Sequence, residues 1–224
     1  AEAIQRKWQP DLPMLYSFRG FVSCNPLLTT RDHVAAMERA LRTLELATDQ
    51  GFLLNIALDH LSLSRANMMK TQSDGGLGYS QAAHHLDDAV AGLRLAGQQD
   101  EMPRCLLARA ELRRVTGYSD GARLDLAEAM TIAERGGTRR HAHLGFARLA
   151  LAEGDPKEAR EHLDTADAMI EEMEYRRRDP EVQLGYARLA LLEDSHDRAR
   201  EHLERAKGMI EEMGAHGMDH EVAE

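Results

Sequence analysis

Apolar and small residues recur along this chain at intervals of three and four, with charged residues between them. The clearest stretch carries Ala159, Leu163 and Ala166 among acidic and basic positions. This spacing places the three side chains on one face of an α-helix. β-branched residues are sparse, whereas Ala, Leu, Glu and Arg, which favour helices, are abundant. The pattern therefore predicts an all-α protein.

The helical pattern repeats with a period of 40 residues. Residues 143–182 align without a gap on residues 183–222, and 22 of these 40 positions are identical. An upstream copy keeps the frame when Gly117 is placed on Gly154. Each copy has a small residue on a first helix, a turn seven residues later, and Ala, Leu and Ala on a second helix. In the clearest copy the turn is Gly154-Asp155-Pro156, a sequence that ends one helix and begins the next.

Two less regular units are expected upstream of these copies. Helices are predicted over 34–47 and 53–70, with Asn25-Pro26 and residues 29–32 as helix breakers and a loop over Thr71–Tyr79. The approximate units are residues 12–50, 53–97, 101–137, 138–176 and 178–214. Five helix-turn-helix units predict a right-handed α-solenoid that forms a single domain over residues 1–224.

The small positions resemble those of the tetratricopeptide (TPR) repeat family. That family has small residues at the middle of its first helix and at two places on its second, which here are Ala147, Ala159 and Ala166. The usual TPR period is about 34 residues, and the usual tryptophan and closing proline are missing here. The resemblance implies a scaffold that binds a protein or an extended peptide, with no catalytic role.

A narrower resemblance concerns the C-terminal repeat arrays of bacterial signal-transduction NTPases of the NACHT type. It rests on the runs LLARAELRRVTGYSDGARLDLAEAMTIAERGG, FARLALAEGD, IEEMEYRRRDPEV and LYSFRGFVSC. It implies a sensor or regulatory array that works with NTPase or effector modules of the same larger protein. The sequence contains no GxxxxGK[ST] loop, so the NTPase itself is not in these residues. Since the chain begins with Ala, we expect a processed product or an excised piece of a longer protein. The alternatives in function are a freestanding adaptor and an enzyme built on a helical scaffold.

Charge and cysteine content narrow the partners and the compartment. The formal net charge is −10, which argues against nucleic acid, because binding there requires a basic surface. No apolar run has the length of a membrane span. Cys24 and Cys105 lack zinc-site spacing, so we expect free thiols in a cytoplasmic protein.

Arginines are the candidate ligand-binding residues. In a TPR fold the residue after the first small position faces the concave groove, and here it is Arg65, Arg148 and Arg188, while Glu111 interrupts the row. Arginine binds carboxylates with two parallel hydrogen bonds, so the ligand is expected to be acidic. The full set of expected groove residues is Arg65, Arg104, Arg114, Arg148 and Arg188, with Leu61, Leu107, Leu144 and Leu184 as an apolar floor. The alternative is that each arginine pairs with a glutamate of a neighbouring unit.

Other candidate chemistry has a simpler structural interpretation. His84 and His85 are adjacent and therefore point to different faces of a helix, while His162 and His202 recur because the repeat recurs. We therefore expect no metal site, no cofactor and no catalytic residues. The last unit repeats the apolar residues Met209, Ile210 and Met213 with no further unit to cover them. We therefore expect this end to be covered by the tail folding back, by self-association with a second copy, or by sequence outside these residues.

Overall fold

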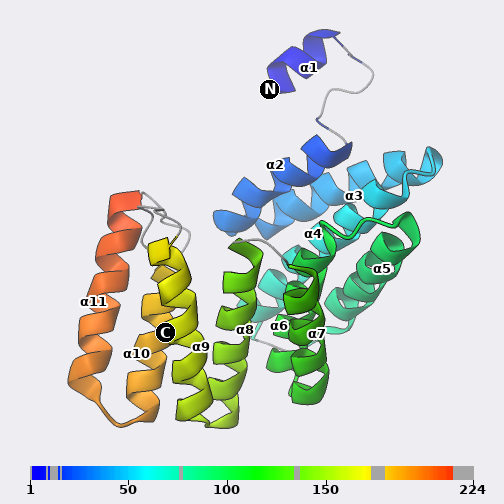
Figure 1. Ribbon diagram of the computed structural model, residues 1–224. Helices are drawn as coiled ribbons and strands as arrows, with labels where there is room; N and C mark the ends of the chain where they lie inside the picture. Colours follow the sequence, from blue (N-terminus) through cyan, green and yellow to red (C-terminus); the bar gives the residue numbers. More distant parts are fainter. Residues whose placement is uncertain are drawn as a thin grey trace. The chain divides into compact units, whose positions relative to one another are not determined.

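The computed structural model describes residues 2–8, 10, 15, 17–75, 78–133, 137–172 and 180–213. These residues form helices and short turns, with no strand among them (Figure 1). The all-α class predicted from the sequence is confirmed. The helices are α1 (Glu2–Trp8), α2 (Ser17–Thr29), α3 (His33–Asp49), α4 (Leu53–Ser73), α5 (Ser80–Ala96), α6 (Met102–Val115), α7 (Ser119–Ile132), α8 (Gly137–Glu153), α9 (Pro156–Glu172), α10 (Pro180–Leu192) and α11 (His196–Met213).

The chain divides into two compact units, Ala1–Leu112 and Arg113–Glu224. In the first unit α2 packs on α3, α3 on α4, and α4 on α5. In the second unit α8 packs on α9 and α10 on α11, as neighbouring antiparallel helices (Figure 1). The pairs α2–α3, α4–α5, α8–α9 and α10–α11 are those that the repeat predicts. The prediction of a single continuous domain stays a prediction.

The small residues of the repeat lie where the helices cross. Ala147, Ala159 and Ala166 are at most 1% exposed, and the equivalent Ala187, Ala199 and Ala206 are at most 2% exposed. Small side chains let the helix backbones approach closely, and leucines such as Leu163 fill the space between neighbouring helix pairs. The predicted core positions are therefore confirmed.

The turn Gly154-Asp155-Pro156 has the predicted role. Gly154 has a φ of +76°, a left-handed conformation that suits glycine at the end of a helix. Asp155 Oδ1 then accepts hydrogen bonds of 3.0 Å from the backbone N–H groups of Lys157 and Glu158. This caps the N-terminus of α9, where Pro156 has no N–H that needs a partner.

Two predicted breaks in the helices are wrong. Pro26 lies inside α2, which continues to Thr29. The helix buries Phe21, Cys24 and Leu28, and this packing outweighs the backbone hydrogen bond that the proline removes. The predicted loop at Thr71 also begins too early, since α4 continues to Ser73. Thr71 is buried, and tertiary packing of this side chain outweighs the low helix propensity of the segment.

Candidate functional site

Arg65 and Arg104 are the two candidate arginines of the first unit. Arg65 is half-buried on α4 and donates a 2.9 Å hydrogen bond from Nη1 to Oδ1 of Asn25 on α2. Burial lowers the pKa of the Arg65 guanidinium, and the nearby positive charge of Arg104 lowers it further. Arg104 is more than half exposed at the start of α6, with Glu101 3.3 Å away. Among the described residues no carboxylate forms an ion pair with Arg65.

The remaining candidate arginines lie in the second unit. Arg148 of α8 forms an ion pair with Glu181 of α10 at 3.2 Å. This is the pairing with a glutamate of the neighbouring repeat that the sequence analysis gave as the alternative. Arg188 and Arg114 are half-buried, and both have interactions with other described residues. Of the five candidate arginines, Arg65 is therefore the one that we expect to be available to a ligand carboxylate.

The candidate leucines are parts of the packed interior. Leu61 is 1% exposed and Leu144 and Leu184 are 2% exposed, while Leu107 is half-buried. Their burial shows that they stabilise the helix pairs. A ligand could contact the three buried leucines only after the surrounding helices moved, whereas Leu107 is partly accessible. Their role as a groove floor stays a prediction.

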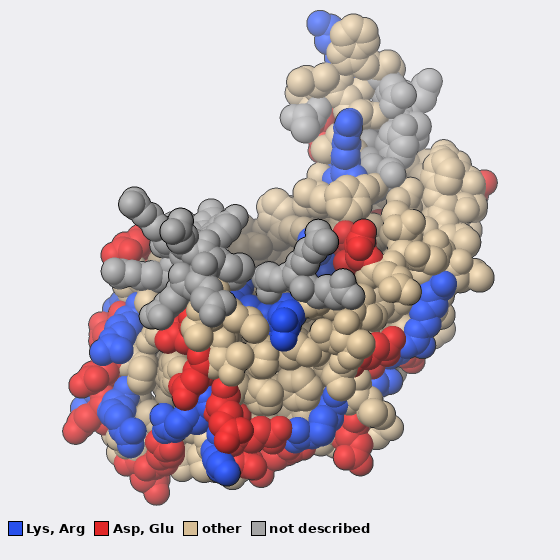
Figure 2. Space-filling model, in the orientation of Figure 1, with Lys and Arg blue, Asp and Glu red and all other residues tan. Residues whose placement is uncertain are grey.

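A second set of arginines, on the second helix of each repeat, connects neighbouring repeats. Arg123 of α7 contacts Glu153 and Glu158 at 2.6 and 2.5 Å, and Arg160 of α9 contacts Glu193 at 2.6 Å. Arg123 and Arg160 each follow the first small residue of their helix, so the contact recurs with the repeat. Figure 2 shows basic and acidic side chains interleaved over α9–α11. These pairs are mutually neutralised and offer little free charge to a ligand.

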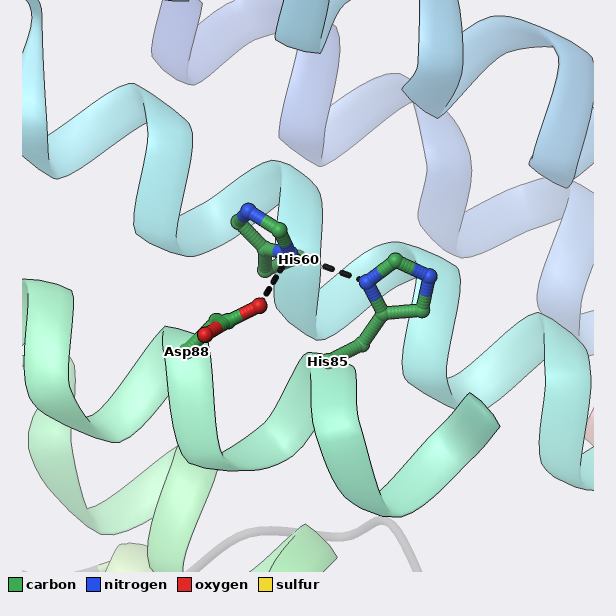
Figure 3. Close-up of side chains that lie close together, drawn as sticks. All are labelled: His60, His85 and Asp88. Carbon is green, nitrogen blue, oxygen red and sulfur yellow. Dashed lines mark hydrogen bonds and ion pairs between the residues drawn. The ribbon is translucent and has the colours of Figure 1, made fainter. Parts of the chain in front are cut away.

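A cluster of histidines and a carboxylate lies between α4 and α5. The Nδ1 atoms of His60 and His85 are 2.9 Å apart, and Oδ2 of Asp88 is 3.7 Å from His60 Nδ1 (Figure 3). His84 Nε2 is 3.3 Å from the same carboxylate oxygen. Burial lowers the pKa of both His60 and His85, which favours their neutral forms. Sequence reasoning missed this cluster because it compared His85 only with its sequence neighbour.

The repeat register contains the signal that would have found it. His60 and His143 both stand four residues before the small position of the first helix, and His85 and His162 both stand three residues after the small position that begins the second. The structure brings each pair together, since His143 Nδ1 and His162 Nδ1 are also 2.9 Å apart. Comparing the histidines of the two repeats would therefore have predicted both contacts.

The C-terminal helix α11 shows less exposed apolar surface than its sequence predicts. Ile210 is 1% exposed and Met209 is half-buried. The side chain of Met213 and the following tail, residues 214–224, lie outside the described part of the chain. Ile210 is therefore not available as a contact residue for a second copy.

Both cysteines are free, as expected, and both are fully buried. Burial raises the pKa of the Cys105 thiol to about 12 and also raises that of Cys24. Neither thiol is therefore a reactive nucleophile in the folded chain. Within the described residues, every helix is too short or too polar to cross a membrane.

Comparisons with known proteins identify the fold. No protein family profile matches the sequence, and no curated protein matches it. Two solved structures of a putative kinesin light chain with nearly identical TPR-like repeats from Podospora anserina are similar. One of them, a variant with a single substitution, has a TM-score of 0.61 at 16% identity and covers 88% of this chain and 95% of its own. The other has a TM-score of 0.58 at 16% identity, with 87% and 95% covered.

The helix pairs, the buried small residues and these structural neighbours define a TPR-like helical-repeat fold. At 16% identity the likeness concerns the fold alone.

Proposed function

We propose that this chain is a scaffold that binds an acidic segment of another protein through Arg65 and Arg104. The observation that carries this proposal is the environment of Arg65. Its half-buried guanidinium is held by the neutral amide oxygen of Asn25 and lies near a second guanidinium. Two like charges brought together without a carboxylate partner for Arg65 favour the binding of an anion between them.

The charge of the chain favours a peptide carboxylate over a nucleic acid phosphate as the ligand of this site. The chain has 38 acidic and 28 basic side chains, so its long-range field repels a nucleic acid backbone. A short acidic segment requires positive charge only where it binds, and the planar guanidinium of an arginine can donate two parallel hydrogen bonds to one carboxylate. Arg104 is more than half exposed, and a ligand carboxylate would compete with Glu101 for it.

The test uses a pair of fluorescent extended peptides that differ only in carrying Glu or Gln at alternate positions. The unmodified chain is expected to bind the Glu peptide more tightly in a fluorescence polarisation titration. Arg65→Gln and Arg104→Gln should each weaken that binding by about tenfold or more, since one charge-assisted hydrogen bond contributes about 1.5–3 kcal/mol. Arg42→Gln is the matched control, because it removes an exposed arginine of the same unit.

Two outcomes of this titration would contradict the proposal. One is equal binding of the Glu and Gln peptides by the unmodified chain. The other is a loss of affinity in Arg42→Gln as large as that in Arg65→Gln, which would indicate a general effect of net charge. Circular dichroism of each variant shows whether the helices remain intact.

We further propose that the scaffold is a sensor or regulatory array of a larger cytoplasmic signalling protein. What supports this is the sequence resemblance to the repeat arrays of NACHT-type NTPases. Occupancy of the arginine pair would then be relayed through the packed helices to a neighbouring module. A freestanding adaptor is the alternative. Sequencing the full reading frame separates the two, because only the first requires an adjoining NTPase or effector domain.

Self-association through α11 belongs to the same proposal. Its support is the half-buried Met209, although the buried Ile210 reduces the apolar area available. Light scattering is expected to show a concentration-dependent mass that falls in Met209→Lys. A constant monomer mass in both chains would contradict it.

A further inference from the structure

The contact between α4 and α5 in the second repeat combines two imidazoles and a carboxylate. His60 comes from α4, and His85 and Asp88 come from α5, one turn apart on the same face (Figure 3). One potential ligand atom of each residue lies within 4.8 Å of those of the other two. The His60 side chain is 17% exposed and that of Asp88 is 40% exposed, so the cluster is anchored in the core but open to solvent.

We propose that His60, His85 and Asp88 form a binding site for a divalent first-row transition metal ion such as Zn²⁺. Two neutral imidazole nitrogens and one carboxylate oxygen are a ligand set that suits such ions. This inference is independent of the peptide-binding function proposed above, because it involves none of the same residues.

The distances are close to those of a tetrahedral zinc site. With metal–ligand bonds of about 2.0–2.1 Å, neighbouring ligand atoms of a tetrahedron are about 3.3 Å apart. Here the Nδ1–Nδ1 distance is 2.9 Å and the distance from His60 Nδ1 to Asp88 Oδ2 is 3.7 Å. Moving each of these pairs by about 0.4 Å would satisfy both contacts. The ligand atoms of His85 and Asp88 lie within 4.8 Å of each other, so that pair has to come closer as well.

The fourth position has two candidate ligands, water and His84. His84 is 76% exposed, and its Nε2 lies 3.3 Å from the Asp88 oxygen that faces His60. With water as the fourth ligand the metal would keep an exchangeable position, as in catalytic zinc sites, whereas coordination by His84 would fill all four positions with protein ligands. Rotation of the exposed His84 side chain determines which of the two sites forms.

Without metal, the two imidazoles share one hydrogen bond, in which one Nδ1–H donates and the other Nδ1 accepts. Metal binding requires both rings in the tautomer with hydrogen on Nε2, so that both Nδ1 lone pairs face the ion. The metal would therefore replace a hydrogen bond that already holds α4 to α5. The cost of organising the two rings is small, because the fold has already placed them.

The fourth repeat provides an internal comparison. His143 and His162 have the same Nδ1–Nδ1 distance of 2.9 Å, and their ring centroids are 5.2 Å apart against 5.1 Å for His60 and His85. The position of Asp88, six residues after the small residue of the second helix, is occupied there by a threonine. The ring of Phe146 also stacks on His162, with centroids 4.8 Å apart. Glu158 Oε1 lies 3.9 Å from Nε2 of His162, on the ring nitrogen that does not face His143. The hydrogen-bonded pair is thus common to both repeats, and a carboxylate beside the two Nδ1 atoms distinguishes the second repeat.

Titration of the metal-free full chain with Zn²⁺ and with Co²⁺ tests the proposal. Calorimetry should show one principal Zn²⁺ site, and Co²⁺ should give the intense visible absorption of a four-coordinate ion. Asp88→Asn and His60→Gln should each weaken binding by at least about tenfold and remove that absorption. His143→Gln is the control and should bind as the unmodified chain does, because the carboxylate in its repeat, Glu158, is near Nε2 of His162 instead of Nδ1 and is already paired with Arg123.

The glutamine variants are chosen to keep the fold. In the fifth repeat Gln183 stands in the place of His60 and makes a 2.9 Å hydrogen bond with Nδ1 of His202. If His60→Gln nevertheless unfolds, Asp88→Asn still decides, since it leaves both histidines in place. No Zn²⁺ binding by the unmodified chain would overturn the proposal. So would unchanged binding in Asp88→Asn, or a loss in His143→Gln equal to that in His60→Gln.

Discussion

Asp59 is a buried carboxylic acid whose ionisation is expected to control the pH dependence of stability. It is 2% exposed on α4, and Thr43 Oγ1 of α3 donates a 2.7 Å hydrogen bond to Asp59 Oδ1. Burial raises the pKa of Asp59 to about 7, although the Thr43 hydrogen bond and the charge of Arg39 act in the opposite direction. Desolvation of the carboxylate is the larger effect, so the neutral acid is favoured in the folded chain.

The sign of the effect follows from the raised pKa. Between the ordinary aspartate pKa of 3.8 and a pH of about 7, the folded chain holds a proton that the unfolded chain has released. The free energy of unfolding therefore falls as pH rises through this window, by up to about 1.4 kcal/mol per pH unit. Over the whole window the loss amounts to about 4 kcal/mol. Above a pH of about 7 this contribution changes no further.

Asp59→Asn separates this contribution from that of other titrating groups. Asparagine has nearly the same shape, keeps an oxygen that can accept from Thr43, and cannot ionise. Urea unfolding of both chains, followed by circular dichroism at about pH 5 and about pH 8, measures the difference. Relative to the unmodified chain, the variant should gain about 3 kcal/mol of stability between these two pH values. Asp49→Asn, which removes an exposed carboxylate at the end of α3, controls for the loss of one charge.

A parallel pH dependence of Asp59→Asn and the unmodified chain would refute this reasoning. It would mean that Asp59 is already ionised near pH 5, with the charge of Arg39 outweighing desolvation. A gain of similar size in Asp49→Asn would instead attribute the effect to the acidic net charge of the chain.

Three further predictions concern the packing of the repeats. Ala159→Leu and Ala199→Leu should each lower the free energy of unfolding by about 1–3 kcal/mol, because both alanines are buried at a helix crossing; unchanged melting temperatures would show that this crossing is misplaced. Gly185→Ala should destabilise the chain by a similar amount in urea unfolding, since the new Cβ would lie 2.5 Å from a methyl group of the buried Leu163. Gly208→Ala is the matched control: its Cβ meets no atom within 4 Å, so this variant should be more stable by about 0.5–1 kcal/mol. Arg160→Ala should cost at most about 1 kcal/mol and less at high salt, because its ion pair is partly exposed; a loss that salt does not reduce would point to packing by the arginine stem.

The fold was predictable because its determinants are local and repeated. A small residue, a turn and three further positions at helical spacing recur in register, and each copy supports the interpretation of the others. The burial of Ala159 and Ala199 follows directly from this pattern. Pro26 and Thr71 were misinterpreted because each was weighed alone, as a helix breaker or a loop residue. Packing of the whole helix outweighs one such residue.

The candidate site was predictable only in part, because the partners of long side chains come from distant segments. Position in the repeat selects Arg65 and Arg148 as equivalent residues. Their partners differ, however: Asn25 precedes Arg65 by 40 positions, whereas Glu181 follows Arg148 by 33. The partner of Arg65 is neutral and that of Arg148 is charged. The position of an arginine in its repeat therefore predicts where it lies, and the residues of the neighbouring repeat determine whether its charge is neutralised.

The three repeats with a histidine on the second helix separate structural stability from metal chemistry. The contact between the two helices of a repeat persists whether the first helix supplies His60, His143 or Gln183. Any side chain that can exchange one hydrogen bond with the histidine therefore satisfies the fold. The residue one turn further along the second helix differs each time, being Asp88, threonine and arginine in turn. The histidine contact forms in the other two repeats without a carboxylate at that position, so substitution of Asp88 tests metal binding with little cost to the fold.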